Sequence, residues 1–395
     1  MARPVDRILT THVGSLVRSS PLYELLVARE NGGPYDHERL EAELDSGVDE
    51  VVRKQLGVGL DIINDGEFRK TKSWMSYIND RLSGFELREG GGSMMETLNG
   101  KDWKDFAEFY DEYNKAQMPP RLSVMSWAIT GPIRYTGHAE VQADIAAMKQ
   151  AIAGLDPIDV FMPAVAPASV VPGGLDQHLT TDKAFLFQLA EALREEYKAI
   201  VDAGFVLQID DAFIATTYDV MVPPGTLQDF RRWAELRIDA LNHALEGIPA
   251  ERTRYHVCWG SWNGPHSNDV EVKDIIDLIL KVNVGGYSLE MANPRHEHEW
   301  RVWETVKLPP GKILIPGVIT HHIITVEHPR LVADRIVRFA KLVGRENVIA
   351  GTDCGFAQVD MIQRVHPEVM WAKFESLVEG ARIATDELWG RKAAA

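Results

Sequence analysis

Near its C-terminus the chain reads Val348-Ile349-Ala350-Gly351-Thr352-Asp353-Cys354-Gly355, a short apolar run that ends in polar residues and a glycine. Continuous runs rich in Val and Ile are typical of strands that are buried on both faces of a parallel sheet. Seven further runs share this form: Ile8–Ser15, Leu60–Glu67, Leu122–Gly131, Phe205–Ala212, Arg254–Gly260, Gly286–Asn293 and Ile313–Ile319. The sequence therefore offers eight candidate strands.

Amphipathic stretches with helical spacing separate many of these runs. The clearest are Leu40–Leu56, Lys183–Ala203, Leu227–Leu245, Val270–Val282 and Val332–Leu342. Apolar residues that recur every three or four positions, with charged residues between them, predict helices that cover a sheet on one face. Eight alternations of strand and helix predict an α/β fold, a (β/α)₈ TIM barrel formed by residues 1–395 as a single domain. A doubly wound open sheet is the alternative.

Two regions do not fit eight simple repeats, and we interpret both as insertions. Val160–Ser169 resembles a ninth strand, but Pro163 and Pro167 disfavour a central strand, so we place it in an insertion between strands 3 and 4. Residues 71–121 form an insertion after strand 2 and contain Gly90-Gly91-Gly92. This second insertion is interpreted either as a helical lid or as an ordinary packing excursion.

The composition excludes several classes of protein. Of the 395 residues, 45% are hydrophobic and 25% are charged, and the net charge is −16 at pH 7. So acidic a chain is unsuited to binding nucleic acid or anionic membranes through a general surface. There is no long apolar window for a membrane span and no apolar signal core, so we expect a cytoplasmic protein. Two cysteines cannot build a disulfide framework, and the oligomeric state is left open.

Both cysteines lie where a metal ligand would be expected. In Tyr255-His256-Val257-Cys258 the strand geometry points His256 and Cys258 to the same side, so they can address one ion together. Cys354 and Glu290 end two other candidate strands, and the C-terminal ends of barrel strands meet at one mouth. Imidazole, two thiolates and a carboxylate predict a Zn²⁺ site. A zinc ion with thiolate ligands favours the ionisation of a further thiol, which predicts alkyl transfer to sulfur.

We interpret the protein as a zinc-dependent methyl or alkyl transferase that forms a thioether from a small-molecule thiol. The nearest alternative is the opening of an epoxide by a thiol, which needs no methyl carrier. A zinc hydrolase and a non-catalytic thiol or metal binding protein rank lower, since two thiolate ligands disfavour attack by metal-bound water. His296 and His298 lack the His-Glu-x-x-His spacing of a zinc hydrolase and are expected to be solvated.

The chain resembles the catalytic barrel of the cobalamin-independent methionine synthase family, and more closely its short single-barrel relatives, which include epoxyalkane:coenzyme M transferase-like proteins. The resemblance spans nearly the whole chain as spaced motifs. These are Thr11-His12-Val13-Gly14-Ser15, Asn64-Asp65-Gly66-Glu67, Thr130-Gly131-Pro132, Gln208-Ile209-Asp210-Asp211, His256-x-Cys258, Glu290 and Asp353-Cys354-Gly355. The ordered series of His-x-Cys, Glu and Asp-Cys-Gly at strand ends is the most specific of them.

The resemblance implies a (β/α)₈ barrel, bound zinc and a place in methionine biosynthesis, with a homocysteine-like thiol as acceptor and an alkyl donor as second substrate. It implies that four residues bind the acceptor: His12, Ser15, Glu67 and Asp210. His322 or its neighbour His321 falls on the proton-donating histidine of the family. The donor stays open among folate, a corrinoid, an epoxide or another carrier, because His138 stands at about the place of the tryptophan that stacks on folate.

Overall fold

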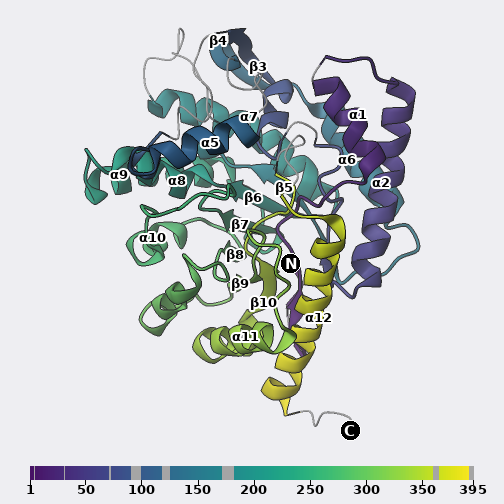
Figure 1. Cartoon of the computed structure of the whole chain (residues 1–395), viewed down its shortest axis with the longest axis vertical. Coiled ribbons are helices and arrows are strands. Elements are labelled where there is room, and N and C mark those ends of the chain that lie inside the picture. Colours follow the sequence, from purple (N-terminus) through teal and green to yellow (C-terminus); the bar gives the residue numbers. More distant parts are fainter. Residues whose placement is uncertain are drawn as a thin grey trace.

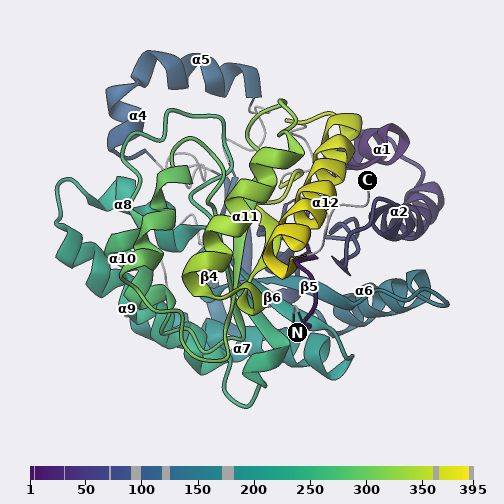
Figure 2. The same cartoon turned by 90° about the horizontal axis from the view of Figure 1, so that it is seen from below.

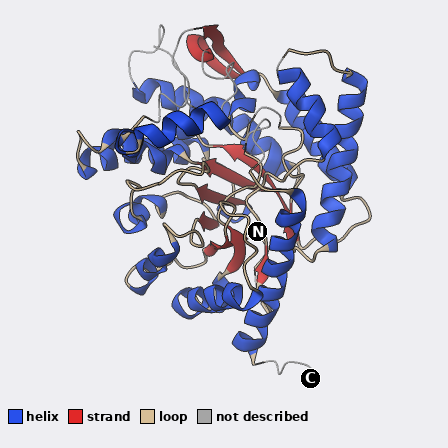
Figure 3. Cartoon of the chain, viewed as in Figure 1, coloured by secondary structure: helices blue, strands red, loops and turns tan. Residues whose placement is uncertain are grey.

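The chain, seen in a computed structural model, is described for residues 1–3, 5–30, 32–70, 73–89, 99–117, 125–170, 182–358 and 364–390. Its centre is an eight-stranded parallel sheet with the strand order β1-β10-β9-β8-β7-β6-β5-β2 (Figure 3). The strands are β1 (Leu9–Thr10), β2 (Ile62–Ile63), β5 (Asp159–Val165), β6 (Val206–Asp211), β7 (Thr253–Val257), β8 (Gly286–Leu289), β9 (Ile313–Ile319) and β10 (Ile349–Thr352).

The two end strands of this order, β1 and β2, come together and nearly close the sheet into a barrel. The backbone amide of Asp61, just before β2, donates to the carbonyl of Thr10 at 3.3 Å. The hydroxyl of Thr11 donates to the carbonyl of Ile62 at 3.1 Å. The predicted (β/α)₈ barrel is therefore confirmed, and the open doubly wound sheet is not observed.

Helices surround the barrel (Figure 1). They are α1 (Ser20–Glu30), α2 (His37–Gly57), α6 (His138–Ala151), α7 (Asp182–Asp202), α8 (Phe213–Met221), α9 (Leu227–Ala244), α10 (Val272–Ile279), α11 (Pro329–Val343) and α12 (Pro367–Trp389). Short 3₁₀ turns complete the connections: η1 (Ser76–Arg81), η3 (Pro167–Ser169), η4 (Ala250–Arg252), η5 (Glu297–Glu304) and η6 (Arg345–Asn347). No helix in the described ranges combines the length and apolar character needed to cross a membrane.

Side chains from most of the barrel strands fill the space inside the ring. They are Leu9, Ile62, Phe161, Val206, Ile313, Ile315 and Ile349. Above Phe161 lies the buried guanidinium of Arg254, 3.6 Å from the ring centroid. Arg254 donates to Gln208 Oε1 at 2.7 Å, to Thr11 Oγ1 at 3.0 Å and to the carbonyl of His12 at 2.8 Å. This network ties β1, β6 and β7 together directly beneath the strand ends that carry the polar motifs.

The third barrel strand is not the one that we predicted. The described part of Leu122–Gly131 belongs to β4 (Met125–Tyr135), which pairs antiparallel with β3 (Leu82–Glu89) in a separate two-stranded sheet. The third position in the barrel is taken by β5, within Val160–Ser169. The two predicted insertions are therefore one, between β2 and β5, and the antiparallel pair of β3 and β4 stands apart from the barrel in Figure 3.

Pro163 is tolerated in β5 because one neighbouring strand ends early. β2 pairs only with Asp159 and Val160, so the ladder on that side has stopped before Pro163. The carbonyl of Pro163 accepts a hydrogen bond from Lys70, which follows β2, and a residue's amide and carbonyl point to the same side of a strand. An amide hydrogen at this position would have no strand to donate to, so proline costs the sheet no hydrogen bond here.

The rest of the described insertion contains two helices, α4 (Lys101–Asp105) and α5 (Ala107–Gln117). They lie on the side of the molecule opposite the N-terminus (Figure 2). Tyr110 of α5 accepts a hydrogen bond at 3.0 Å from the indole of Trp262, which follows β7. The helices are thus attached to the loop that follows β7, and their role as a lid stays a prediction. Gly90-Gly91-Gly92 lies outside the described residues.

Candidate metal and acceptor site

Three of the predicted metal ligands meet at the C-terminal ends of the strands. His256 belongs to β7, Cys258 follows this strand, and Cys354 follows β10. One donor atom from each lies within 4.8 Å of the other two, all three side chains are buried, and no other such group of three occurs among the described residues. The two sulfur atoms are 3.5 Å apart. The spacing of His-x-Cys and Asp-Cys-Gly in the sequence thus corresponds to one compact cluster.

The donor chemistry of this cluster fits a zinc ion. Nε2 of His256 is buried without a hydrogen-bond partner, while its Nδ1 lies 3.3 Å from the hydroxyl of Ser288. The hydroxyl of Ser261 lies 3.1 Å from Sγ of Cys354 and 3.4 Å from Sγ of Cys258. Hydrogen bonding between the sulfurs lowers the pKa of Cys354 well below its ordinary value and raises that of Cys258. An unpartnered imidazole nitrogen and two adjacent sulfurs suit zinc.

Glu290, the fourth predicted ligand, lies beside the cluster rather than in it. Its Oε1 accepts from the backbone amide of Trp259 at 2.8 Å, and its Oε2 accepts from Asn293 Nδ2 at 2.8 Å. Burial, then the charges of Asp353 and Cys354, raise the pKa of Glu290 well above its ordinary value. These two hydrogen bonds hold the carboxyl near the sulfurs but outside the group of three, as an exchangeable ligand would lie.

Glu67 and Asp210 form a buried acidic pair near the cluster. Burial and then the charge of Asp210 raise the pKa of Glu67 to about 8. Burial, together with the charge of Cys354, raises the pKa of Asp210 to about 8. Lys70 lowers both pKa values but does not offset the burial. A second cation, such as the ammonium group of a ligand, would allow both carboxylates to ionise.

A tight turn after β2 fixes the position of Glu67. The side chain of Asn64 accepts from the amide of Gly66 at 2.8 Å, and Asp65 accepts from the amide of Glu67 at 2.9 Å. Glu67 has φ of 59°, in the left-handed region that side chains rarely adopt. Its carboxylate lies so close to Gly14 that a Cβ there would be 2.2 Å from Oε1. The backbone cost of this conformation is consistent with a functional role.

The two predicted acceptor residues of the first strand have different surroundings. Ser15 borders the loop that carries Cys354: its carbonyl accepts from the amide of Phe356 at 2.8 Å. Val13 packs against both cysteines, and side chains alternate along an extended chain, so His12 points elsewhere. His12 Nε2 lies 2.7 Å from Oε1 of Gln55 in α2, and the ring is buried. The structure thus brings Ser15, but not the ring of His12, toward the cluster.

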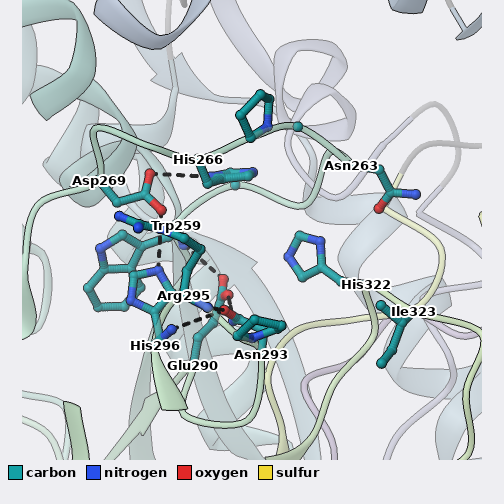
Figure 4. A pocket seen from close by; sticks show the side chains of 14 residues that line it. Trp259, Asn263, His266, Asp269, Glu290, Asn293, Arg295, His296, His322 and Ile323 are labelled. Carbon is teal, nitrogen blue, oxygen red and sulfur yellow. Dashed lines mark hydrogen bonds and ion pairs between the residues drawn. The ribbon is translucent and has the colours of Figure 1, made fainter. Parts of the chain in front are cut away.

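The two candidate proton donors differ in their access to the site. His322 lines a pocket of about 380 Å³ together with Glu290, Asn293 and Trp259, and Figure 4 shows its ring across this pocket from Trp259. Burial lowers the pKa of His322 to about 3, so its ring is neutral at physiological pH. His321 is fully buried behind it, with ring centroids 4.1 Å apart and no partner on either ring nitrogen. Only His322 can meet a ligand in the pocket.

The opposite wall of the pocket carries an ionic chain that we did not predict. Nδ1 of His266 lies 3.2 Å from Asp269, whose other oxygen lies 3.4 Å from Nε2 of His296. Nδ1 of His296 lies 2.6 Å from Glu299 (Figure 4 shows the first three residues). Burial opposes the charge, but Asp269 and Glu299 raise the pKa of His296 to about 10. The expectation that His296 is solvated is therefore wrong, whereas His298 is exposed.

A signal for this chain is present in the sequence. His266 and Asp269 are three residues apart, and so are His296 and Glu299. Residues at this spacing face each other in helical backbone, as His296 and Glu299 do at the start of η5, whereas His266 has φ of 50° and lies in a loop. What the sequence does not reveal is that the two pairs, from different loops, share Asp269.

Comparison with known proteins agrees with this architecture. Residues 164–373, more than half of the chain, match the family model described as cobalamin-independent synthase, catalytic domain. A Bacillus subtilis (strain 168) protein called uncharacterized protein YxjH is 26% identical over 93% of this chain and 92% of its own length. The methionine synthase of Sulfolobus acidocaldarius is 23% identical over 98% of this chain and 95% of its own.

Among solved structures, a B12-independent methionine synthase from Shewanella sp. W3-18-1, in complex with selenomethionine, has the same fold. The TM-score is 0.72 with 19% sequence identity, and the alignment covers 97% of this chain and 99% of that one. The extent of the family-model match, together with full-length relatives, establishes the relationship. The chain belongs to the cobalamin-independent methionine synthase family.

Proposed function

We propose that the protein is an enzyme that transfers a methyl group to the sulfur of a small, homocysteine-like thiol, with zinc held by His256, Cys258 and Cys354. The buried group of one imidazole and two sulfurs carries this proposal. Bound zinc would lower the pKa of the acceptor thiol, so that a nucleophilic thiolate exists at neutral pH. Glu290 lies close enough to act as a ligand that gives way to the acceptor.

The acidic pair provides the second part of the acceptor site. Glu67 and Asp210 are both buried, and the pKa of each is raised to about 8 although Lys70 is nearby. One lysine is therefore not enough to balance two buried carboxylates. An ammonium group placed between them would supply that charge and orient the acceptor with its sulfur toward the cysteines. Ser15, on the loop contact beside Cys354, borders the same space.

His322 is the group proposed to move the proton. Methyl transfer to a thiol releases the thiol proton, and the leaving group of the donor needs one. The ring of His322 is neutral and faces the pocket, so a ring nitrogen can accept the first proton and return it to the leaving group. His321, enclosed on all sides, is proposed to support the orientation of His322 rather than to contact substrate.

The test combines elemental analysis with a turnover screen. We expect one zinc per chain after purification without added metal, and loss of free thiol when homocysteine is offered with a suitable methyl donor. The screen should include a methylated folate, a methylated corrinoid and an epoxide, because these donors differ in the leaving group. The proposal would be refuted if the purified protein contained no zinc and, after zinc was added, neither bound nor consumed any thiol.

A further inference from the structure

The loop between β9 and α11 carries His322, and its apolar side chains contribute little to holding it in place. His322 is followed by Ile323, Ile324 and Val326, whose side chains are 42%, 69% and 40% exposed. Figure 4 shows His322 and Ile323 on this loop at the edge of the pocket. Apolar side chains fix a segment in proportion to the area that they remove from water. The position of His322 must therefore depend largely on other contacts.

A buried ion pair attaches this loop to α12. Nζ of Lys373 donates to Oε2 of Glu327 at 2.9 Å and to the carbonyl of Thr325 at 2.6 Å. The side chain of Lys373 is fully buried, and that of Glu327 is 6% exposed. The hydroxyl of Ser376, one turn further along α12, donates to the carbonyl of Glu327. Both partners of Lys373 belong to the loop, so one face of α12 holds the loop through polar contacts.

Glu327 also closes the loop on itself. Its Oε1 accepts from the backbone amide of Thr320 at 2.8 Å, so one carboxylate joins the two ends of the loop. The hydroxyl of Thr320 in turn accepts from the backbone amide of His322 at 3.1 Å. A continuous series of contacts thus runs from Lys373 through Glu327 and Thr320 to His322.

Stability alone would not favour an ion pair at this place. The replacement of a buried ion pair by well-packed apolar side chains is often neutral or stabilising. An apolar side chain, however, cannot accept from the amide of Thr320 or donate to the carbonyl of Thr325, which lie on either side of His322 in the chain. The ion pair therefore fixes the course of the backbone from which the ring of His322 projects.

We propose that Glu327 and Lys373 are positioning residues for proton transfer, which hold the ring of His322 at the pocket without contacting substrate. This inference rests on the proposed function, in which His322 moves the proton. A ring nitrogen has to come within about 3 Å of the atom with which it exchanges a proton. Misplacement by about 1 Å can lower a rate by about 100-fold, so a loop with exposed apolar side chains needs such fixed points.

The experiment asks whether Glu327 acts through His322. We measure kcat and KM for the thiol, with the donor found in the screen, for zinc-loaded wild type, Glu327→Gln, His322→Ala and the double variant. Glutamine has a single acceptor oxygen and cannot serve both Thr320 and Lys373. For Glu327→Gln we expect kcat to fall by about 10- to 100-fold, with KM and zinc content unchanged.

The double variant separates positioning from a general structural role. In the His322→Ala background Glu327→Gln should lower kcat no further, because two residues that act through one group are not additive. The inference is overturned if Glu327→Gln leaves kcat unchanged, or if it lowers kcat by the same factor with and without His322.

Asp61→Asn is the matched control, since Asp61 makes the same two kinds of contact at the other end of the barrel strands. Its carboxylate accepts from Arg7 at 2.9 Å and from the backbone amide of Thr10 at 2.8 Å, and its side chain is 8% exposed. We expect a comparable loss of thermal stability with unchanged kcat. An equal fall of kcat in this control would show that lost stability alone slows turnover, and the inference would then be wrong.

Hydrogen exchange reports on the loop directly and needs no substrate. In Glu327→Gln the amides of residues 320–326 should exchange faster with deuterated water than in wild type, and in Asp61→Asn they should not. Unchanged exchange in Glu327→Gln would show that the ion pair does not hold the loop. If Glu327→Gln does not fold, Ser376→Ala takes its place, because it removes only one hydroxyl; exchange and kcat that both match wild type would then overturn the inference.

Failure of the proposed function has a different signature. Wild-type protein that consumes no thiol with any donor refutes that function. The exchange measurement then still decides whether Glu327 and Lys373 hold the loop that carries His322.

Discussion

Replacing Asp210 by asparagine should stabilise the ligand-free protein at neutral pH while weakening acceptor binding. Burial raises the pKa of Asp210 from 3.8 to about 8, so the folded chain holds a proton there that the unfolded chain has already released. Between these two values the native state binds more protons than the unfolded state. The free energy of unfolding therefore falls as the pH rises through this window.

The size of the effect follows from the same values. A pH of 7 is roughly 3 units above the ordinary pKa of the carboxyl, the value that applies in the unfolded chain. At 1.36 kcal/mol per unit, keeping this group protonated in the folded chain lowers the free energy of unfolding by about 4 kcal/mol at pH 7. Asparagine cannot ionise in either state and removes this penalty. Its side-chain oxygen can still accept the hydrogen bond that Gln208 donates to Asp210 at 2.7 Å. The gain should be small near pH 4 and approach its full value near pH 8.

The assay is urea unfolding of metal-free protein at several pH values between about 4 and 8, for wild type and Asp210→Asn. The matched control is Asp239→Asn, at an exposed aspartate of α9, which should show no such trend. The reasoning would be refuted if Asp210→Asn were no more stable than wild type at any pH, or if its gain did not grow with pH. The same variant should bind homocysteine more weakly, since it lacks one of the two charges proposed to hold the ammonium group.

Three further changes test other parts of the site. Cys354→Ser should lose zinc and methyl transfer together, because a hydroxyl is a poor substitute for a thiolate; a variant that retained both by elemental analysis and assay would exclude Cys354 as a ligand. Glu67→Gln should weaken homocysteine binding by about 10-fold or more in calorimetry with zinc unchanged, and an unaltered affinity would remove Glu67 from the acceptor site. Gly317→Ala should lower the free energy of unfolding by roughly 1–3 kcal/mol, because the added Cβ would lie 2.1 Å from Oδ1 of Asp353; an unchanged melting temperature would contradict this close approach.

Local patterns in the sequence were sufficient for the barrel and for the metal cluster. The alternation of buried strands and amphipathic helices has a direct physical cause, the burial of a parallel sheet by helices. The meeting of His256, Cys258 and Cys354 follows from it, because the C-terminal ends of parallel strands share one mouth. These are properties of each segment on its own, which is why they can be read before any tertiary contact is known.

The structure differs from the predictions where the outcome depends on which distant segments pair or pack together. The described part of Leu122–Gly131 is a strand, as predicted, but nothing in the local sequence indicates that it pairs with β3 rather than with the barrel. Pro163 disfavours a central strand only if both neighbours continue alongside it, and β2 does not. The ring of His12, which was predicted to bind the acceptor, lies against Gln55 of α2, while Val13 packs in one cluster with both cysteines. Binding of the acceptor by His12 stays a prediction. In each case a residue far away in the sequence decides the outcome.

The attachment of α4 and α5 to the barrel mouth bears on how the enzyme would release its product. The described contacts include hydrogen bonds, since Asp102 accepts from the amide of Ser267 at 2.8 Å and Trp262 donates to Tyr110 at 3.0 Å, and the side chains of Trp103 and Tyr110 are buried. Water can replace these hydrogen bonds, each at a net cost of about 1 kcal/mol. We therefore expect the two helices to separate from the mouth often enough for a finished thioether to escape, so that turnover need not wait for any part of the barrel to unfold.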